Sequence, residues 1–471
     1  MKTLSQNLFL QATLAAVLVS LLAGHVKAQT FTTLHSFSAS APDRDLPILA
    51  STNSDGESVY AGLVLSGNTL YGTACNGGTN GTGTIFAVNT DGTGFRLVHT
   101  FSQNYGTNTD GVNPSGGLIL SGNTLYGTAG DGGFNGVGTV FAVNTNGTGF
   151  TVLHHFGITN TDGLTPSGSL ILSGNTLFGT TQYSTNGIYA GSGTVFAVNT
   201  DGNGFSIVHR FSNLFAETNS EGSRPWAELT LSSNILYGTT EEGGTNGFGS
   251  VFAVKTDGTG FKVLHMFNGT DGANSESGLT LSGNTLYGTT PGTVFAVNTD
   301  GTGFTNLYNI GSSAGLILSG KTLYGTSGTS YGPGQQGYGS VFAFNTNGTG
   351  FTTLYNFYGN PNMYSPYAGL ILSGSTLYGT TLAGGTNGNG GVFSLSFPSP
   401  QLSINRFGTN VDLTWSSLVD AFNGGLSLQS TTNLIPPFVW TAASPAPVII
   451  NGQYVVTNAI TGPQRFYRLS Q

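Results

Sequence analysis

The chain has 471 residues, of which 75 are glycine, 38% are hydrophobic and only 7% are charged. Glycine without a three-residue period excludes collagen, and the apolar content excludes a disordered polar chain. The net charge of −8 excludes a surface that tracks nucleic acid phosphates, and a single cysteine, Cys75, excludes a disulfide scaffold or a multi-thiolate metal site.

Residues 1–28 have the pattern of a secretory signal peptide. Lys2 lies in a short polar segment, residues 14–23 are almost wholly apolar, and Val26 and Ala28 form a small-residue cleavage pattern before Gln29. This apolar run is too short to cross a bilayer core of about 30 Å. No later stretch reaches about 18 apolar residues, so no transmembrane span is expected. We therefore expect a protein that is secreted or held at the bacterial cell surface or outer envelope.

A tandem repeat follows the leader. Its first string is LILSGNTLYGT (residues 118–128), its second GTVFAVNTNGTGF (138–150) and its third FTVLHHF (150–156). The aromatic residue of the first string recurs at Tyr71, Tyr126, Phe178, Tyr237, Tyr287, Tyr324 and Tyr378. Each unit predicts four short strands joined by Gly- and Asn-containing turns, and we expect neighbouring blades to pack closely at the glycine after the aromatic residue. Four strands in about 50 residues, repeated in tandem, are typical of a β-propeller.

The two ends of the repeat array are complementary. The last unit stops after residues 391–397 and lacks a fourth strand, whereas residues 31–37 form a fourth strand without a preceding unit. A ring in which the N-terminal strand completes the last unit explains both ends, and an open solenoid needs neither. We therefore predict a seven-bladed propeller over residues 29–397, with residues 31–37 as the outer strand of the last blade.

The repeat strings resemble a known bacterial family. LxLxGNxLYGT, GGTNGxG, GTVFAVN and FxxLHxF are similar to the GloVer (Gloeo/Verruco) tandem repeat, and the resemblance covers nearly all of residues 30–397. It implies an exported protein joined to one of several kinds of sorting or anchoring tail. It implies no catalytic residue.

Residues 398–471 contain no repeat. After Pro398 and Pro400 come several short alternating runs, with Trp415 on an early one, which predict a small β-sandwich. The opening LTW and the closing FYRL resemble a fibronectin-III-like module at the ends of exported bacterial proteins. Such a module is either a sorting or attachment domain or a spacer.

Histidine and acidic residues recur at fixed repeat positions. The histidines are His35, His99, His154, His209 and His265, with Tyr308 and Tyr355 at the same position in the other two units. Equivalent residues of adjacent blades are more than about 10 Å apart, too far to share a metal, so we expect a structural role between blades. The acids that precede glycine in the loops are Asp55, Asp110, Asp162, Asp271 and Glu221. We expect turn chemistry there, with a Ca²⁺ site as the alternative, and no other cofactor.

Departures from the repeat mark the candidate site. At the start of the innermost strand six units carry Gly or Ser, but the fourth carries Glu228, shortly after Trp226, and its next loop carries Glu241 and Glu242. Other departures are tyrosines in loops or at strand starts: Tyr60, Tyr183, Tyr189, Tyr331, Tyr364 and Tyr367. Small residues at a channel mouth with aromatic rings and acids suit a face that binds a sugar or a peptide. The plainer interpretation is that these loops have merely drifted.

Three functions remain open from the sequence. The leading hypothesis is a binding or interaction module for an extracellular glycan or protein, with Trp226, Glu228, Tyr60, Tyr364 and Tyr367 as ligand-binding candidates. The alternative is an extracellular carbohydrate-active lyase or hydrolase that uses Glu228 with another acid of the same region, Glu221, Glu241 or Glu242. A structural component of a surface layer is the third. No nucleic acid partner is expected.

Overall fold

The computed structural model of the chain describes residues 29–42, 51–103, 107–157, 162–184, 192–215, 217–311, 314–328, 331–332, 335–359, 362–398, 401–416, 427–435, 439–450, 453–462 and 464–470. Every regular element in these ranges is a β-strand, which confirms the predicted all-β class. None of the described segments is a helix able to cross a membrane. The predicted signal peptide, residues 1–28, lies outside the described residues. The chain divides into two compact units, Phe31–Leu395 and a unit that includes Ser396–Gln471.

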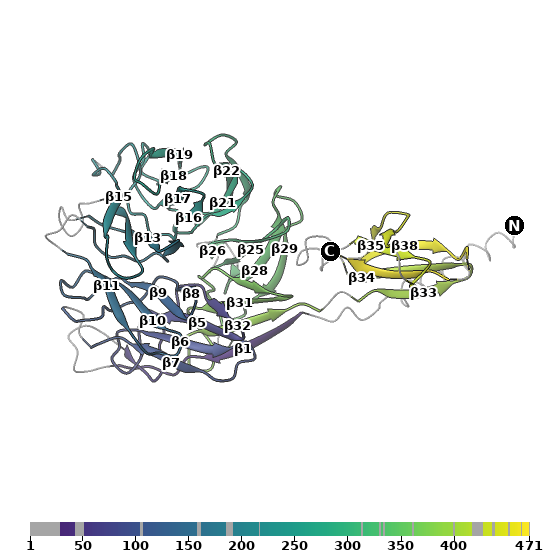
Figure 1. Ribbon diagram of the computed structural model, residues 1–471, viewed down its shortest axis with the longest axis horizontal. Helices are drawn as coiled ribbons and strands as arrows, with labels where there is room; N and C mark the ends of the chain where they lie inside the picture. Colours follow the sequence, from purple (N-terminus) through teal and green to yellow (C-terminus); the bar gives the residue numbers. More distant parts are fainter. Residues whose placement is uncertain are drawn as a thin grey trace. The chain divides into compact units, whose positions relative to one another are not determined.

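The first unit consists of propeller-like four-stranded antiparallel sheets, seven among the described residues. In the first sheet β4 (Val64–Ser66) pairs with β5 (Thr69–Ala74), β5 with β6 (Thr84–Asn89) and β6 with β7 (Arg96–Thr100). The second sheet contains β8 (Ile119–Ser121), β9 (Thr124–Ala129), β10 (Thr139–Asn144) and β11 (Thr151–His155). The third contains β12 (Ile171–Ser173), β13 (Thr176–Thr181), β14 (Thr194–Asn199) and β15 (Ser206–Arg210). Figure 1 shows first strands such as β8 toward the middle of this unit and fourth strands such as β11 at its outside.

The remaining sheets repeat this order. They are β16 (Thr230–Ser232), β17 (Ile235–Thr240), β18 (Ser250–Lys255), β19 (Lys262–Met266); β20 (Thr280–Ser282), β21 (Thr285–Thr289), β22 (Val294–Asn298), β23 (Thr305–Tyr308); and β24 (Ile317–Ser319), β25 (Thr322–Ser327), β28 (Ser340–Asn345), β29 (Thr352–Asn356). Two short pairs, β2 (Ala41–Pro42) with β3 (Ser51–Thr52) and β26 (Tyr331–Gly332) with β27 (Gln335–Gln336), lie in connecting segments.

The seventh sheet joins the two ends of the repeat region. Its order is β1 (Thr30–Ser36), β32 (Gly391–Ser396), β31 (Thr376–Thr381) and β30 (Ile371–Ser373), so the first strand of the chain lies beside the last strand of the repeats. Asn387 adds a side-chain hydrogen bond to the Phe37 carbonyl over 3.0 Å.

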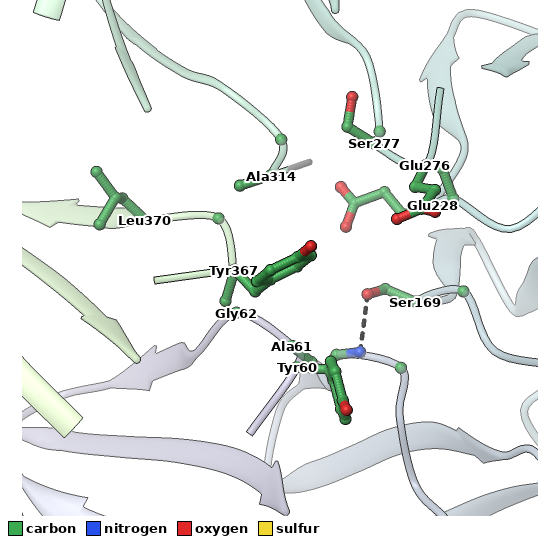
Figure 2. Close-up of a pocket in the computed structure, with 18 of the residues that line it drawn as sticks. Tyr60, Ala61, Gly62, Ser169, Glu228, Glu276, Ser277, Ala314, Tyr367 and Leu370 are labelled. Carbon is green, nitrogen blue, oxygen red and sulfur yellow. Dashed lines mark hydrogen bonds between the residues drawn. The ribbon is translucent and has the colours of Figure 1, made fainter. Parts of the chain in front are cut away.

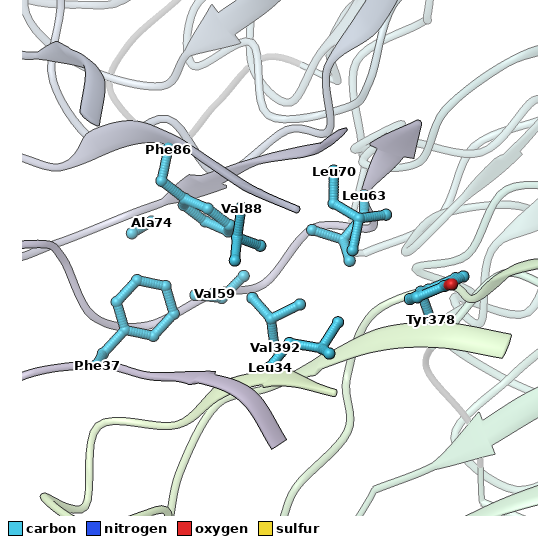
Figure 3. Close-up of a cluster of buried hydrophobic side chains, with 10 residues drawn as sticks. All are labelled: Leu34, Phe37, Val59, Leu63, Leu70, Ala74, Phe86, Val88, Tyr378 and Val392. Carbon is cyan, nitrogen blue, oxygen red and sulfur yellow. The ribbon is translucent and has the colours of Figure 1, made fainter. Parts of the chain in front are cut away.

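The apolar cores lie between neighbouring sheets. One cluster combines Phe37, which follows β1, and Val392 of β32 with Leu70 and Phe86 of the first sheet (Figure 3). These side chains are fully buried. Burial on both faces explains why the third strand of each unit is an unbroken apolar run in the sequence.

The glycine after the repeated aromatic residue is required within its own sheet. Gly127 is paired with Phe141 across β9 and β10, and a Cβ at Gly127 would lie 2.6 Å from the Phe141 ring. The Phe141 ring therefore covers the glycine of its partner strand, so the prediction of a close contact with the neighbouring blade at this glycine is wrong. The same phenylalanine and glycine recur in every unit.

A threonine connects each sheet to the next. Thr128 of β9 donates a hydrogen bond from Oγ1 to the Gly168 carbonyl of the following sheet over 3.1 Å. Equivalent bonds join Thr73 to Gly116, Thr180 to Ala227, Thr239 to Ser277, Thr289 to Ala314, Thr326 to Ala368 and Thr380 to Ala61. Each donor is buried, so these bonds are shielded from water.

The repeated histidines also act between sheets, as expected. His35 of β1 stacks on Phe95, directly before β7, with ring centroids 3.6 Å apart, and its Nε2 lies 2.9 Å from Asp55. The other pairs with loop acids are His99–Asp110, His154–Asp162, His209–Glu221 and His265–Asp271. Tyr308 and Tyr355, which replace histidine, stack in the same way on Phe351 and Phe31. Histidine pairing, rather than turn geometry alone, accounts for the recurring acids.

The second unit contains two antiparallel sheets. One has the order β33 (Ser403–Phe407), β34 (Asn410–Ser416), β38 (Gln453–Ala459), β37 (Val448–Ile450), and the other β36 (Thr441–Ala442), β35 (Ser427–Thr431), β39 (Phe466–Ser470). Trp415 and Val456 of the first sheet pack with Leu428 of the second in one core.

Candidate functional site

A cavity of about 370 Å³ lies where the seven sheets of the first unit meet. It is lined by the short segments that lead into the first strand of each sheet, so every sheet contributes to it. We name as collar residues the residue two positions before the first strand of each sheet: Gly62, Gly117, Ser169, Glu228, Gly278, Gly315 and Gly369.

The collar residues pack against one another. A Cβ at Gly278 would lie 2.9 Å from Cγ of Glu228, so the adjacent glycine makes room for that glutamate side chain. Ser169 accepts a hydrogen bond from the Gly117 N–H over 2.9 Å (Figure 2). The Ser169 hydroxyl also favours the ionised form of the Glu228 carboxyl. Glu228 is the one collar residue with a large side chain, because the others are glycine or serine.

The residue two positions before each collar residue supplies the chemistry of the lining. Three of these residues are exposed aromatic side chains, Tyr60 (47%), Trp226 (37%) and Tyr367 (38%). A fourth is Glu276, which also lines the cavity (Figure 2). Glu276 was not predicted from the sequence: the departures noted at this position were aromatic, and acids were sought at the collar position, where the fifth unit carries an ordinary glycine.

Backbone geometry fixes these segments in place. Arg224, four positions before its collar residue, has a positive φ of 55°, as does Ser365 with 56°. The Arg224 N–H donates to the Ser192 carbonyl of the preceding sheet over 2.9 Å, and its carbonyl accepts from the Glu241 N–H of its own sheet over 3.1 Å. A residue held in this uncommon conformation between two sheets leaves the following segment little freedom.

The two cavity acids are the only charged side chains among the described residues of the lining. The protein packed around the Glu228 carboxyl disfavours its charged form and raises its pKa, and the Ser169 hydrogen bond opposes this rise. Burial also raises the pKa of Glu276, opposed by the charge of Arg224.

The other candidate acids have partners outside the lining. Arg224 contacts Glu241 through Nε at 3.5 Å and Glu242 through Nη1 at 2.5 Å, and its Nη2 donates to the Tyr183 hydroxyl over 2.9 Å. Burial raises the pKa of Glu241, and the Arg224 charge opposes this rise. Glu221 is paired with His209. Neither Glu241 nor Glu242 lines the cavity with Glu228.

Comparison with known proteins gives the family. Residues 25–219 and 212–316 match the family model described as the Gloeobacter/Verrucomicrobia repeat. The chain belongs to this family. None of the curated proteins matches it. Among solved structures, it is similar to the GH74 enzyme of Niastella koreensis, with 12% identity and a TM-score of 0.50 over 85% of this chain and 68% of that one.

A second solved structure with a similar fold is the extracellular domain of a hybrid two-component system of B. thetaiotaomicron. Its identity is 11% and its TM-score 0.50, over 82% of this chain and 46% of that chain. A third is an oligogalacturonate lyase in complex with manganese, with 9% identity and a TM-score of 0.47, over 79% of this chain and 97% of that one.

The Gloeobacter/Verrucomicrobia repeat match includes most of the cavity residues. Tyr60, Trp226, Glu228 and Glu276 lie within it, whereas Tyr367 follows its end. Of the remaining tyrosines that depart from the repeat, those that the structure describes are not part of the lining. Tyr364 packs edge-on against Tyr338, with centroids 5.6 Å apart, and is not part of the lining. Tyr189 lies outside the described residues.

In the described ranges, no group of three or more His, Cys, Asp or Glu side chains could hold a metal ion.

Proposed function

We propose that the chain is an exported or surface-displayed binding protein. The cavity of its first unit, Phe31–Leu395, binds part of an extracellular glycan. The predicted signal peptide supports export, as does the extracellular location of the structurally similar domain from B. thetaiotaomicron. The single observation that carries the proposal is the lining itself: exposed Tyr60, Trp226 and Tyr367 surround one cavity together with two carboxylates.

The proposal includes a closed seven-bladed propeller. The pairing of β1 with β32 and the hydrogen bond from Thr380 to Ala61 support closure, because each joins the last repeat to the beginning of the array. Deletion of residues 29–37 is expected to lower Tm sharply, since the last sheet then loses its outer strand. An unchanged Tm would contradict closure.

The lining chemistry matches a sugar. Aromatic faces stack on the apolar face of a pyranose ring, while carboxylates accept hydrogen bonds from its hydroxyl groups. Other sheets carry Gly or Ser at the collar position, so the fold does not require Glu228 there. A cavity of about 370 Å³ falls at the small end of ligand pockets and suits one or two sugar units.

A glycan array followed by calorimetry tests the proposal. The fluorescently labelled protein without residues 1–28 should retain a subset of glycans, and Trp226→Ala should weaken that binding at least about tenfold. Phe215→Ala is the matched control, because Phe215 is an exposed aromatic (86%) outside the lining. Absence of binding to any glycan, or equal losses in both variants, would overturn the proposal.

Catalysis on a glycan is the second candidate, and one observation favours it. Glu228 and Glu276 line the same cavity, and glycoside hydrolysis uses two carboxyl groups, one of them with a raised pKa. Incubation with the retained glycans, with assays for reducing and unsaturated ends, separates the two functions. Product that disappears in Glu228→Gln would establish the enzyme, whereas retention without product supports binding alone.

A further inference from the structure

We infer that the cavity recognises an amino sugar, with the protonated amine beside Glu228 and Glu276 and the sugar ring against the aromatic side chains. This inference rests on the proposed function and specifies the class of saccharide that the same site takes.

The charge of the lining is the first step. Both charged side chains of the described lining are glutamates, and they come from two adjacent sheets whose collar residues touch. Ser169, which favours the ionised form of Glu228, is neutral. A neutral sugar would cover these two carboxylates and displace water from them without supplying a counter-charge, which is unfavourable. An ammonium group supplies that charge and three hydrogen-bond donors.

The nearby Arg224 supplies only part of this charge: it favours the ionised form of Glu276, but its ion pairs among the described residues are with Glu241 and Glu242. Its guanidinium is already engaged by two carboxylates, those of Glu241 and Glu242, and by the Tyr183 hydroxyl. This cluster has more acidic than basic groups, so it adds negative potential next to the cavity instead of cancelling it. The net charge of the whole chain, −8, has the same sign.

The two tyrosines of the lining, Tyr60 and Tyr367, come from the opposite side of the collar from the acids. Contacts between collar residues place Gly62 beside Gly369, so Tyr60 and Tyr367 come from adjacent sheets. Gly117 and Ser169 separate this pair from Glu228 on one side, and Gly315 separates it from Gly278 on the other. Figure 2 shows Tyr367 across from Glu228 and Glu276, so a sugar ring that stacks on Tyr367 presents its far edge to the glutamates. Trp226, from the same segment as Glu228, adds a ring face that attracts an ammonium ion.

Monosaccharides test the inference without any assumption about glycan linkage. The probes are glucosamine, galactosamine and mannosamine, each compared with its N-acetylated and its 2-hydroxyl counterpart by ligand-observed NMR titration near neutral pH. The amines are expected to bind at least about tenfold more tightly, as for a charge-assisted hydrogen bond. Glu228→Gln/Glu276→Gln should reduce this preference to less than about threefold. Asp257→Asn, which removes an exposed turn carboxylate outside the lining, should retain it.

The outcomes separate the inference from the proposed function. Equal affinity for amines and neutral sugars, or a preference that survives in the double glutamine variant, overturns the amino-sugar inference and leaves a neutral-glycan site. The same holds if the array retains neutral glycans while no amine binds. If neither the array nor the amines bind, the proposed function and the inference are both overturned. A thermal melt of the double variant confirms that it folds.

Discussion

Thr380 donates a hydrogen bond from Oγ1 to the carbonyl oxygen of Ala61 over 3.3 Å, between residues that are 319 positions apart in the chain. It is the last of a series of bonds between equivalent residues of successive sheets. In the others the acceptor follows the donor by 25 to 47 residues, whereas here it lies near the beginning of the chain. This bond is therefore specific to the junction between the two ends of the repeat array.

The first prediction concerns this junction. Thr380→Val keeps the shape of the buried side chain but leaves the Ala61 carbonyl without this donor, so we expect a loss of about 1–3 kcal/mol in the free energy of unfolding. Thr128→Val removes an equivalent bond in the middle of the array and is the matched comparison. Chemical denaturation of both variants measures the effect. An unchanged free energy of unfolding for Thr380→Val would show that this hydrogen bond does not stabilise the protein.

The threonine bonds show which part of the fold could not be predicted from the sequence. Strand periodicity and turn residues were sufficient to locate the four strands of each unit, because they depend on local patterns. Thr128 also recurs in every unit, but its acceptor is a backbone carbonyl, which has no residue-type signature. A contact of this kind between sheets is visible only once the neighbouring sheet is in place.

Part of the candidate site could likewise be predicted from the sequence, and part could not. Comparison of the units located Tyr60, Trp226, Glu228 and Tyr367, because each departs from the repeat. It did not locate Glu276, although this residue stands at the same repeat position as Tyr60, Trp226 and Tyr367. The pairing of Glu241 and Glu242 with Arg224 depends on how two loops fold together, which repeat spacing does not describe.

The second prediction tests the glycine that follows the repeated aromatic residue. Gly127→Ala places a methyl group 2.6 Å from the Phe141 ring in a fully packed core, and we expect a loss of about 1–3 kcal/mol in stability. Gly292→Ala is the control, because nothing lies within 4 Å of a Cβ at that position. Urea denaturation of the two variants should show a large difference. Equal effects would mean that Phe141 moves aside without cost.

The third prediction concerns acid stability. Burial lowers the pKa of His209 and of His265, outweighing the opposing effects of Glu221 and Asp271. The unfolded chain then takes up these protons first, so stability falls as pH decreases below about 6.5. In His209→Tyr/His265→Tyr, which copies Tyr308 and Tyr355 of the other units, the loss between about pH 7 and 5 should be smaller. Thermal melts across this range measure it, and identical pH profiles would contradict the assignment.

The fourth prediction concerns Glu228 in the ligand-free protein. Burial raises the pKa of this carboxyl, so the folded state holds its proton more tightly than the unfolded state does. The ionised form therefore costs stability above the raised pKa, and this cost disappears below the ordinary glutamate pKa of about 4.3. Glu228→Gln keeps an acceptor for Ser169 without the charge. Because the Glu228 side chain is exposed and its charge is partly screened by solvent, we expect only a small rise in Tm at neutral pH, about 1 °C or less.

The control for Glu228→Gln is Asp257→Asn, because the pKa of Asp257 is lowered whereas that of Glu228 is raised. Hydrogen bonds from Thr259 lower the pKa of the exposed Asp257 carboxyl, so Asp257→Asn should not raise Tm at neutral pH. The gain from Glu228→Gln should vanish in melts below about pH 4, where the wild-type carboxyl is already protonated in both states. A lower Tm for Glu228→Gln at neutral pH would mean that the carboxylate is favourably solvated inside the cavity. An amine would then gain less there, and the case for a cationic ligand would weaken along with the stability argument.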